Sequence, residues 1–114
     1  MSTGRDGEEI AKSYLIKKGY QILSQNYHSR FGEIDIIAKE KDCFVFVEVK
    51  TRSSFAFGAP LEAITRFKLR KLIKTSQFFL NRYKLGDVCY RFDAIEIKFL
   101  NGEITIDHVE NITL

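Results

Sequence analysis

The segment Cys43–Thr51 constrains the fold more than any other part of the sequence. It consists of Phe and Val residues until Glu48 and Lys50 interrupt it near its end. Because side chains alternate along a strand, Glu48 and Lys50 share the face of the two phenylalanines, and the three valines lie on the opposite face. A strand that is apolar on both faces is typical of the centre of a sheet that is covered on both sides. The segment therefore predicts a central strand in an α/β domain.

The rest of the chain predicts two helices and four further strands around this one. Gly19 ends a helix over about residues 5–18, and Pro60 begins a second helix that runs to about residue 83. The strands are expected to begin at residue 20 and to span 33–38, 43–51, 88–100 and 103–109, with a polar loop at 26–32 and a hairpin turn at Asn101-Gly102. The order α-β-β-β-α-β-β predicts an antiparallel meander, a crossover to a parallel strand, and a mixed sheet with one helix on each face.

Composition places the chain among globular proteins of one domain, residues 1–114. Apolar residues make up 45% and charged residues 29%, no apolar run is long enough to span a membrane, and the start lacks the apolar segment of a secretory signal. Cys43 and Cys89 both lie inside apolar runs, which favours buried thiols over a disulfide and a reducing, cytoplasmic location. The net charge of +3 permits an acidic partner without requiring one.

Charged residues interrupt the neighbouring strand as well. In the segment 33–38, Glu33 and Asp35 are expected on one face, with Ile34 and Ile36 on the other. A short turn joins this strand to the next, so Asp35 can converge with Glu48 and Lys50 at one end of the sheet. Charges in a buried strand are costly unless they are paired or used.

Two carboxylates and a lysine in this arrangement suit metal-assisted hydrolysis of a phosphodiester. Mg²⁺, or Mn²⁺ in its place, prefers carboxylate oxygens completed by phosphate and water, and a lysine can orient a water or stabilise developing charge. An ion pair between Lys50 and Asp35 or Glu48 at the end of the sheet is the alternative that the spacing leaves open.

Other charged residues fit the same hypothesis and also have simpler interpretations. Glu8 flanks the inner stripe of the first helix and could reach the site, or it could serve only as a first-turn acid favoured by the helix dipole. Basic side chains could contact DNA phosphates or form a solvated helix face. These candidate nucleic-acid contacts are Arg30, Arg52, Lys68, Arg70, Lys71 and Lys74.

Signals for other chemistries are weak. His28 and His108 are far apart, no Cys or His has zinc-ligand spacing, and no glycine-rich phosphate loop or nucleophile elbow occurs. Arg91 and Asp93 share a face of the fourth strand, where we expect a buried ion pair that supports the sheet.

Several blocks together resemble the YraN-like family of small bacterial proteins, which have a restriction-endonuclease-like fold and are similar to Holliday-junction resolvases. The resemblance covers nearly the whole chain and is most specific in the ordered GEID and VEVK blocks. The matching blocks are Gly7-Glu8-x-x-Ala11, Asn26, 31–38, 45–52, Phe57-Gly58, Lys68 and Arg91-Phe92-Asp93.

The resemblance implies a PD-(D/E)xK-type site in which Asp35 and Glu48 bind the metal and Lys50 is the catalytic lysine. Glu8 matches the glutamate of the family's first helix. Ile34 replaces the proline of the motif's name, and His28 stands where an arginine is common. We therefore expect a Mg²⁺-dependent endodeoxyribonuclease, acting on branched DNA and compatible with a homodimer. The alternatives are a non-catalytic nucleic-acid-binding module on the same fold and an interaction protein that uses the outer helix face.

Overall fold

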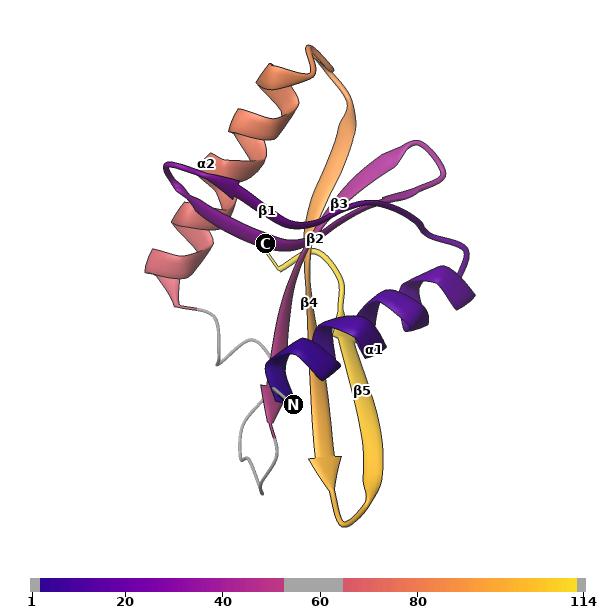
Figure 1. Ribbon diagram of the computed structural model, residues 1–114. Helices are drawn as coiled ribbons and strands as arrows, with labels where there is room; N and C mark the ends of the chain where they lie inside the picture. Colours follow the sequence, from indigo (N-terminus) through magenta and orange to yellow (C-terminus); the bar gives the residue numbers. More distant parts are fainter. Residues whose placement is uncertain (1–2, 53–64, 113–114) are drawn as a thin grey trace.

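The computed structural model describes residues 3–52 and 65–112, which form two helices and one sheet (Figure 1). The order α-β-β-β-α-β-β is confirmed. The elements are α1 (Thr3–Lys17), β1 (Gln21–Ser29), β2 (Gly32–Glu40), β3 (Cys43–Arg52), α2 (Arg66–Arg82), β4 (Cys89–Leu100) and β5 (Glu103–Val109).

The sheet has the predicted mixed topology, with strand order β1-β2-β3-β4-β5. Successive strands are antiparallel except β3 and β4, which are parallel because α2 carries the chain back across the sheet between them. β3 is the central strand, as its apolar sequence predicts.

One helix covers each face of the sheet (Figure 1). α1 packs Ala11 and Leu15 against a cluster that includes the β3 residues Val45 and Val47. α2 packs against the other face, where Phe46 of β3 is fully buried. Both helices therefore pack against β3, whose side chains alternate between the cluster under α1 and the cluster under α2.

The ends of two elements differ from the sequence predictions. β1 continues to Ser29, so residues 26–29 belong to a strand and not to a loop; pairing with β2 overrides the polar composition of this segment. The second helix, as described, begins at Arg66, because Thr65 has an extended backbone and its side chain accepts a hydrogen bond from the Lys68 amide as an N-cap. Pro60, the loop predicted at 53–59 and its Phe57-Gly58 lie outside the described residues.

The two cysteines form a disulfide, so the prediction of free buried thiols is wrong. The parallel register of β3 and β4 places Cys43 directly beside Cys89, with Cα atoms 4.5 Å apart. Cys89 is exposed and Cys43 is half-buried. The apolar residues that follow each cysteine suggested that both would be buried. Both cysteines are instead the first residues of their strands, and the sheet covers them less than it covers the residues that follow. Neither described helix is long and apolar enough to cross a membrane.

Candidate active site at a fork in the sheet

The sheet divides at the positions of Asp35 and Glu48. β2 and β3 pair from Glu40 with Cys43 as far as Ile36 with Val47. Beyond that point, residues 32–34 of β2 pair with β1, and residues 48–52 of β3 pair with β4. The fork leaves space between two strands that are neighbours elsewhere, and it lies where the sequence predicted the charged cluster.

The fork also breaks the regular alternation of β2. Ile34 packs in the cluster under α2, whereas Ile36 packs in the cluster under α1, so the prediction that they share one face is wrong. The Asp35 carboxylate accepts a hydrogen bond from the backbone N–H of Val49 at 2.8 Å. The Asp35 side chain therefore takes the place of the backbone carbonyl that would accept from Val49 if β2 and β3 continued to pair.

The carboxyl groups of Asp35 and Glu48 meet at the fork, close enough for a hydrogen bond when one of them is protonated. Burial, followed by the nearby charge of Asp35, raises the pKa of Glu48 to about 7. Burial also raises the pKa of Asp35, although the Val49 amide opposes this change. The pair therefore binds a proton more tightly than separate surface carboxylates do.

This pair fits a hard divalent cation. Two carboxylate oxygens that approach each other in a half-buried site are the donor set that Mg²⁺ uses, together with water or phosphate. The proton between Asp35 and Glu48 offsets a repulsion that a cation would offset more completely. The donor atoms of this pair are therefore of the type that Mg²⁺ requires.

Two lysines lie beside the carboxyl pair. Lys68 lies next to Lys50 and lowers its pKa; burial lowers the pKa of Lys50 further, while Glu48 and Asp35 oppose the change. Lys68 comes from the first turn of α2, so the structure places it at the site itself and not only on the outer helix face. With Glu48, it lines a hollow of about 200 Å³ between β2, β3 and α2.

Glu8 reaches the same region from α1, on the other side of the sheet. Burial raises the pKa of Glu8, and the charges of Asp35 and Glu33 raise it further. With its amide nitrogen facing the acids, Asn26 donates to Glu8 at 2.8 Å and to Glu33 at 2.9 Å. Glu33 thus belongs to the acidic cluster, and the Asn26 amide joins it to Glu8. The only sequence signal for these two residues was that both fall in segments that match the YraN-like family.

A close helix–sheet contact explains how α1 brings Glu8 to the fork. Gly7 is buried, and a Cβ at this position would collide with the side-chain hydroxyl of Thr51 in β3. The absence of a side chain allows the first turns of α1 to lie directly on the end of β3. The Gly7-Glu8 sequence therefore combines a packing requirement with a charged group.

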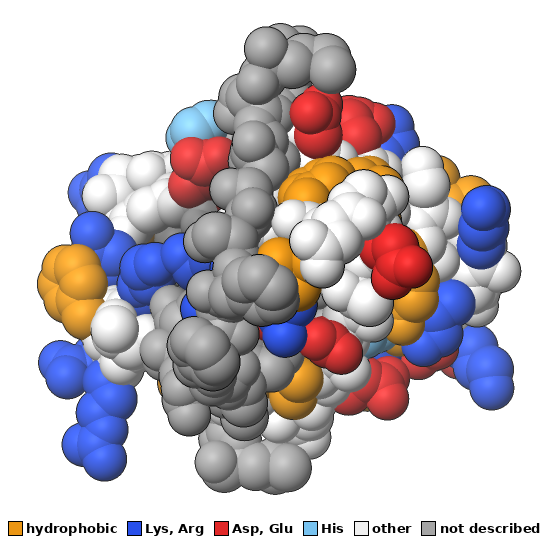
Figure 2. All heavy atoms as spheres, turned by 90° about the horizontal axis from the view of Figure 1, so that it is seen from below, with side chains coloured by type: hydrophobic (Ala, Val, Ile, Leu, Met, Phe, Trp, Pro, Cys, Tyr) orange, Lys and Arg blue, Asp and Glu red, His pale blue; other side chains and the backbone are white. Residues whose placement is uncertain are grey.

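The predicted nucleic-acid contacts separate into two groups. Arg30, Arg70, Lys71 and Lys74 are exposed along with Lys68, and Figure 2 shows Lys and Arg side chains gathered on the side where α2 lies. Arg52 differs, because its Nε lies 2.7 Å from Oε2 of Glu96, a fully buried acid. Glu96, which also pairs with Lys98 at 3.3 Å, escaped the sequence analysis because its strand reads as apolar.

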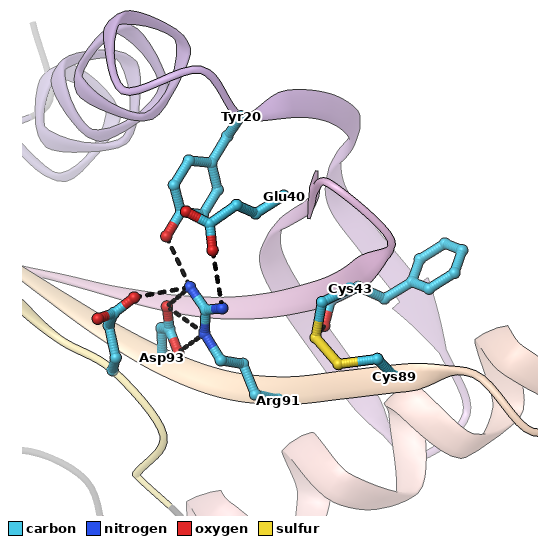
Figure 3. The surroundings of a disulfide bond; sticks show 8 residues. Tyr20, Glu40, Cys43, Cys89, Arg91 and Asp93 are labelled. Atoms are coloured by element: carbon cyan, nitrogen blue, oxygen red, sulfur yellow. Dashed lines mark hydrogen bonds and ion pairs between the residues drawn. A yellow bond between two sulfur atoms is a disulfide. The ribbon is translucent and has the colours of Figure 1, made fainter.

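A second polar cluster surrounds Arg91 near the disulfide (Figure 3). The Arg91 guanidinium contacts Asp93 at 3.1 Å, Glu40 at 3.0 Å and Glu110 at 2.9 Å, and it donates to the Tyr20 hydroxyl at 2.6 Å. The predicted ion pair of Arg91 with buried Asp93 is confirmed, but it is part of a larger network than the spacing suggested.

The Arg91 network already balances its acids. Burial raises the pKa of Asp93, but hydrogen bonds from His108, Arg91 and the Asn111 amide outweigh it and hold the pKa below its ordinary value. Ligand atoms of Asp93, His108 and Glu110 lie within 4.8 Å of one another, yet Arg91 contacts both acids. Among the described residues, this cluster is therefore a charge-compensated support for the sheet.

The fold and the fork define a class of protein: a small mixed α/β domain that gathers acids and lysines between its second and third strands. The chain belongs to the uncharacterised protein family UPF0102, whose model matches residues 7–97. The resemblance to the YraN-like family is thus confirmed.

Relatives of this family match most of the chain. A UPF0102 protein of Caldicellulosiruptor saccharolyticus is 50% identical over 94 residues, covering 82% of this chain and 80% of its own. One of Alkaliphilus oremlandii is 48% identical over 110 residues, covering 95% and 94%. One of Trichlorobacter lovleyi is 42% identical over 112 residues, covering 96% and 88%. Their names assign no activity.

Proposed function

We propose that the protein is a Mg²⁺-dependent endodeoxyribonuclease of the PD-(D/E)xK type. The observation that carries the proposal is the convergence of Asp35 and Glu48, with Lys50 beside them, at a fork in the sheet where Asp35 accepts a hydrogen bond from the Val49 amide. The raised pKa values of both carboxyl groups, and their position where β2 and β3 separate, distinguish this cluster from an ordinary ion pair at the end of a strand. The basic residues of α2 supply the positive surface that a DNA backbone requires.

The residues of the fork have separate roles in the proposed reaction. Asp35 and Glu48 would hold the ion, which when bound polarises the phosphodiester and makes water a better nucleophile. Lys50 donates a hydrogen bond that orients the attacking water or stabilises charge on the phosphorane. Lys68, next to Lys50, adds positive charge near the phosphate. Glu8, from α1, can accept a proton at the edge of the site.

Contacts to phosphates would make binding independent of base sequence, because phosphates carry no sequence information. We propose branched DNA as the substrate on the strength of the family resemblance. Replacing Lys71 or Lys74 with Ala is expected to weaken DNA binding modestly and to reduce its salt dependence.

The test is cleavage of linear, nicked, flapped and four-way DNA in Mg²⁺ and Mn²⁺. We expect Lys50→Ala to lower the cleavage rate at least ~100-fold while leaving DNA affinity nearly unchanged, because Lys50 acts on the transition state. Lys17→Ala, at an exposed lysine in the last turn of α1, is the matched control and should cleave as the wild type does.

Metal binding separates the enzyme from a non-catalytic binding module. Asp35→Asn should weaken Mg²⁺ binding in calorimetry and slow cleavage together, since it removes a ligand charge and keeps the shape. If the wild type cleaves none of these DNAs in either metal, the protein is better described as a nucleic-acid-binding module. If Lys50→Ala cleaves as fast as the wild type, the catalytic site has been misplaced.

A further inference from the structure

A second hollow lies on the surface beside the fork, between the β1–β2 turn and α2. It has a volume of about 650 Å³. Its apolar lining consists of Phe31, from the turn, and Phe78, from α2, whose ring centroids are 6.2 Å apart in an edge-to-face arrangement. The turn lies close to α2 in Figure 1, and the two rings are the contact between them. Phe78 is half-buried here.

The polar lining of this hollow is basic. Three cations, Arg30, Lys74 and Arg82, surround the rings, and no acid is among the lining residues. The Arg30 guanidinium lies 4.9 Å from the centroid of the Phe31 ring, so charge and aromatic surface meet within the hollow. Gln77 and Asn81 add two side-chain amides on the same helix. Positive charge, aromatic rings and amides at one place match the phosphate, face and edges of a nucleotide.

This hollow and the smaller hollow at the proposed active site are lined by adjoining parts of the same two segments, the β1–β2 turn with the start of β2, and α2. Gly32 and Glu33, which follow Phe31 in the chain, line the smaller hollow that contains Glu48. Lys71 of that hollow is one turn of α2 before Lys74 of this one. Between Lys68 and Phe78 the helix axis advances about 15 Å. One DNA strand can therefore follow α2 from the fork to the aromatic rings.

We propose that this hollow binds an unpaired DNA nucleotide, with its base stacked on Phe78 and its phosphate held by the three cations. The inference rests on the proposed function and names its substrate class: DNA in which unpaired nucleotides adjoin a duplex, such as a flap or an open branch point. A base inside a duplex cannot offer its face to an aromatic ring, because both faces are already stacked on neighbouring bases. The hollow therefore distinguishes unpaired DNA from duplex DNA without reading sequence.

The test measures DNA binding in EDTA, so that it does not depend on cleavage. The probe is a short duplex with a flap that carries 2-aminopurine at its unpaired bases, compared with the fully paired duplex. We expect wild-type protein to change the 2-aminopurine fluorescence, because the base stacks on a ring. Phe78→Ala should weaken binding to the flap by about 5- to 150-fold, which corresponds to the loss of one base–aromatic stack, and leave binding to the duplex within about twofold.

Matched variants separate stacking from a general loss of structure. Phe67→Ala removes an aromatic ring from the same helix outside the hollow, where Phe67 is 65% exposed, and should bind both DNAs as the wild type does. Phe31→Ala changes the turn instead of the helix and should reproduce the selective loss. An unchanged 2-aminopurine signal in the wild type, or equal losses for flap and duplex in both Phe variants, would overturn the inference.

The two proposals can fail separately. A wild type that binds the flap through Phe78 but cleaves nothing with Mg²⁺ or Mn²⁺ contradicts the nuclease function and supports the nucleotide site. A wild type that cleaves DNA, while Phe78→Ala and Phe31→Ala bind the flap with unchanged affinity, contradicts the nucleotide site and supports the nuclease.

Discussion

The replacement of Glu48 by Gln should stabilise the metal-free protein at high pH. The wild-type carboxyl group is forced to ionise in a half-buried site beside Asp35, whereas an amide of the same shape carries no charge. The pKa of Glu48 rises from an ordinary 4.5 to about 7 in the folded protein. At 1.36 kcal/mol per pKa unit, this difference is at most about 3 kcal/mol. Partial exposure screens the charge, so we expect a gain of about 1–3 kcal/mol.

The sign of the pH dependence follows from the direction of this change. The folded protein holds the proton more tightly than the unfolded chain does, so Glu48 favours folding most below pH 4.5. This contribution is lost as the pH rises from 4.5 to about 7, and it stays lost at higher pH. Because the proton is shared with Asp35, the transition belongs to the pair.

Urea denaturation in EDTA, from about pH 5 to about pH 8, measures the effect directly as a free energy of unfolding. The difference between Glu48→Gln and the wild type should grow with pH in favour of the variant. Mg²⁺ at the upper end should stabilise the wild type and not the variant. Glu103→Gln, at an exposed acid of β5, is the matched control and should follow the wild type. A difference between Glu48→Gln and the wild type that does not change with pH would refute the reasoning.

Three further predictions concern stability and can be measured by the same denaturation. Gly7→Ala should cost about 1–3 kcal/mol, because the added Cβ collides with Thr51; a stabilising effect would contradict the close packing of α1. Arg91→Met should cost about 3–5 kcal/mol, because it leaves buried Asp93 without its cation, and a cost below ~1 kcal/mol would show that the network is not needed. Cys89→Ser should cost up to about 4 kcal/mol in oxidising buffer and nothing relative to reduced wild type, since the disulfide closes a loop with a sequence separation of 46.

Local sequence patterns were sufficient to predict the order of the helices and strands. The apolar run of β3 identified the central strand, Gly19 ended the first helix with a left-handed φ of 94°, and Asn101-Gly102 formed the last turn. Each of these features depends on a few neighbouring residues. The two faces of the sheet followed as well, because a strand that is apolar on both sides needs a cover on both sides.

Features that depend on distant parts of the chain were not predictable in the same way. The disulfide requires the register of β3 and β4, which no local pattern states. The break in alternation at Asp35 requires the fork, and the contact of Lys68 with Lys50 requires the placement of α2 over β3. The sequence therefore predicted which residues could form a site, but the way in which they are positioned arises from tertiary packing.

The fork also gives β3 an unpaired edge within the part of the chain that the structure describes. After Val47, this strand pairs only with β4, so its other side presents backbone groups to which a strand of another molecule could add. The charged groups of the fork lie along this edge, and the Asp35 carboxylate occupies the Val49 amide. Charges on an edge strand discourage intermolecular pairing and aggregation. The same residues therefore discourage a second strand from adding to this edge of β3, and inactive variants made with Gln, Asn or Ala should be preferred to apolar, β-branched replacements, which would remove this protection.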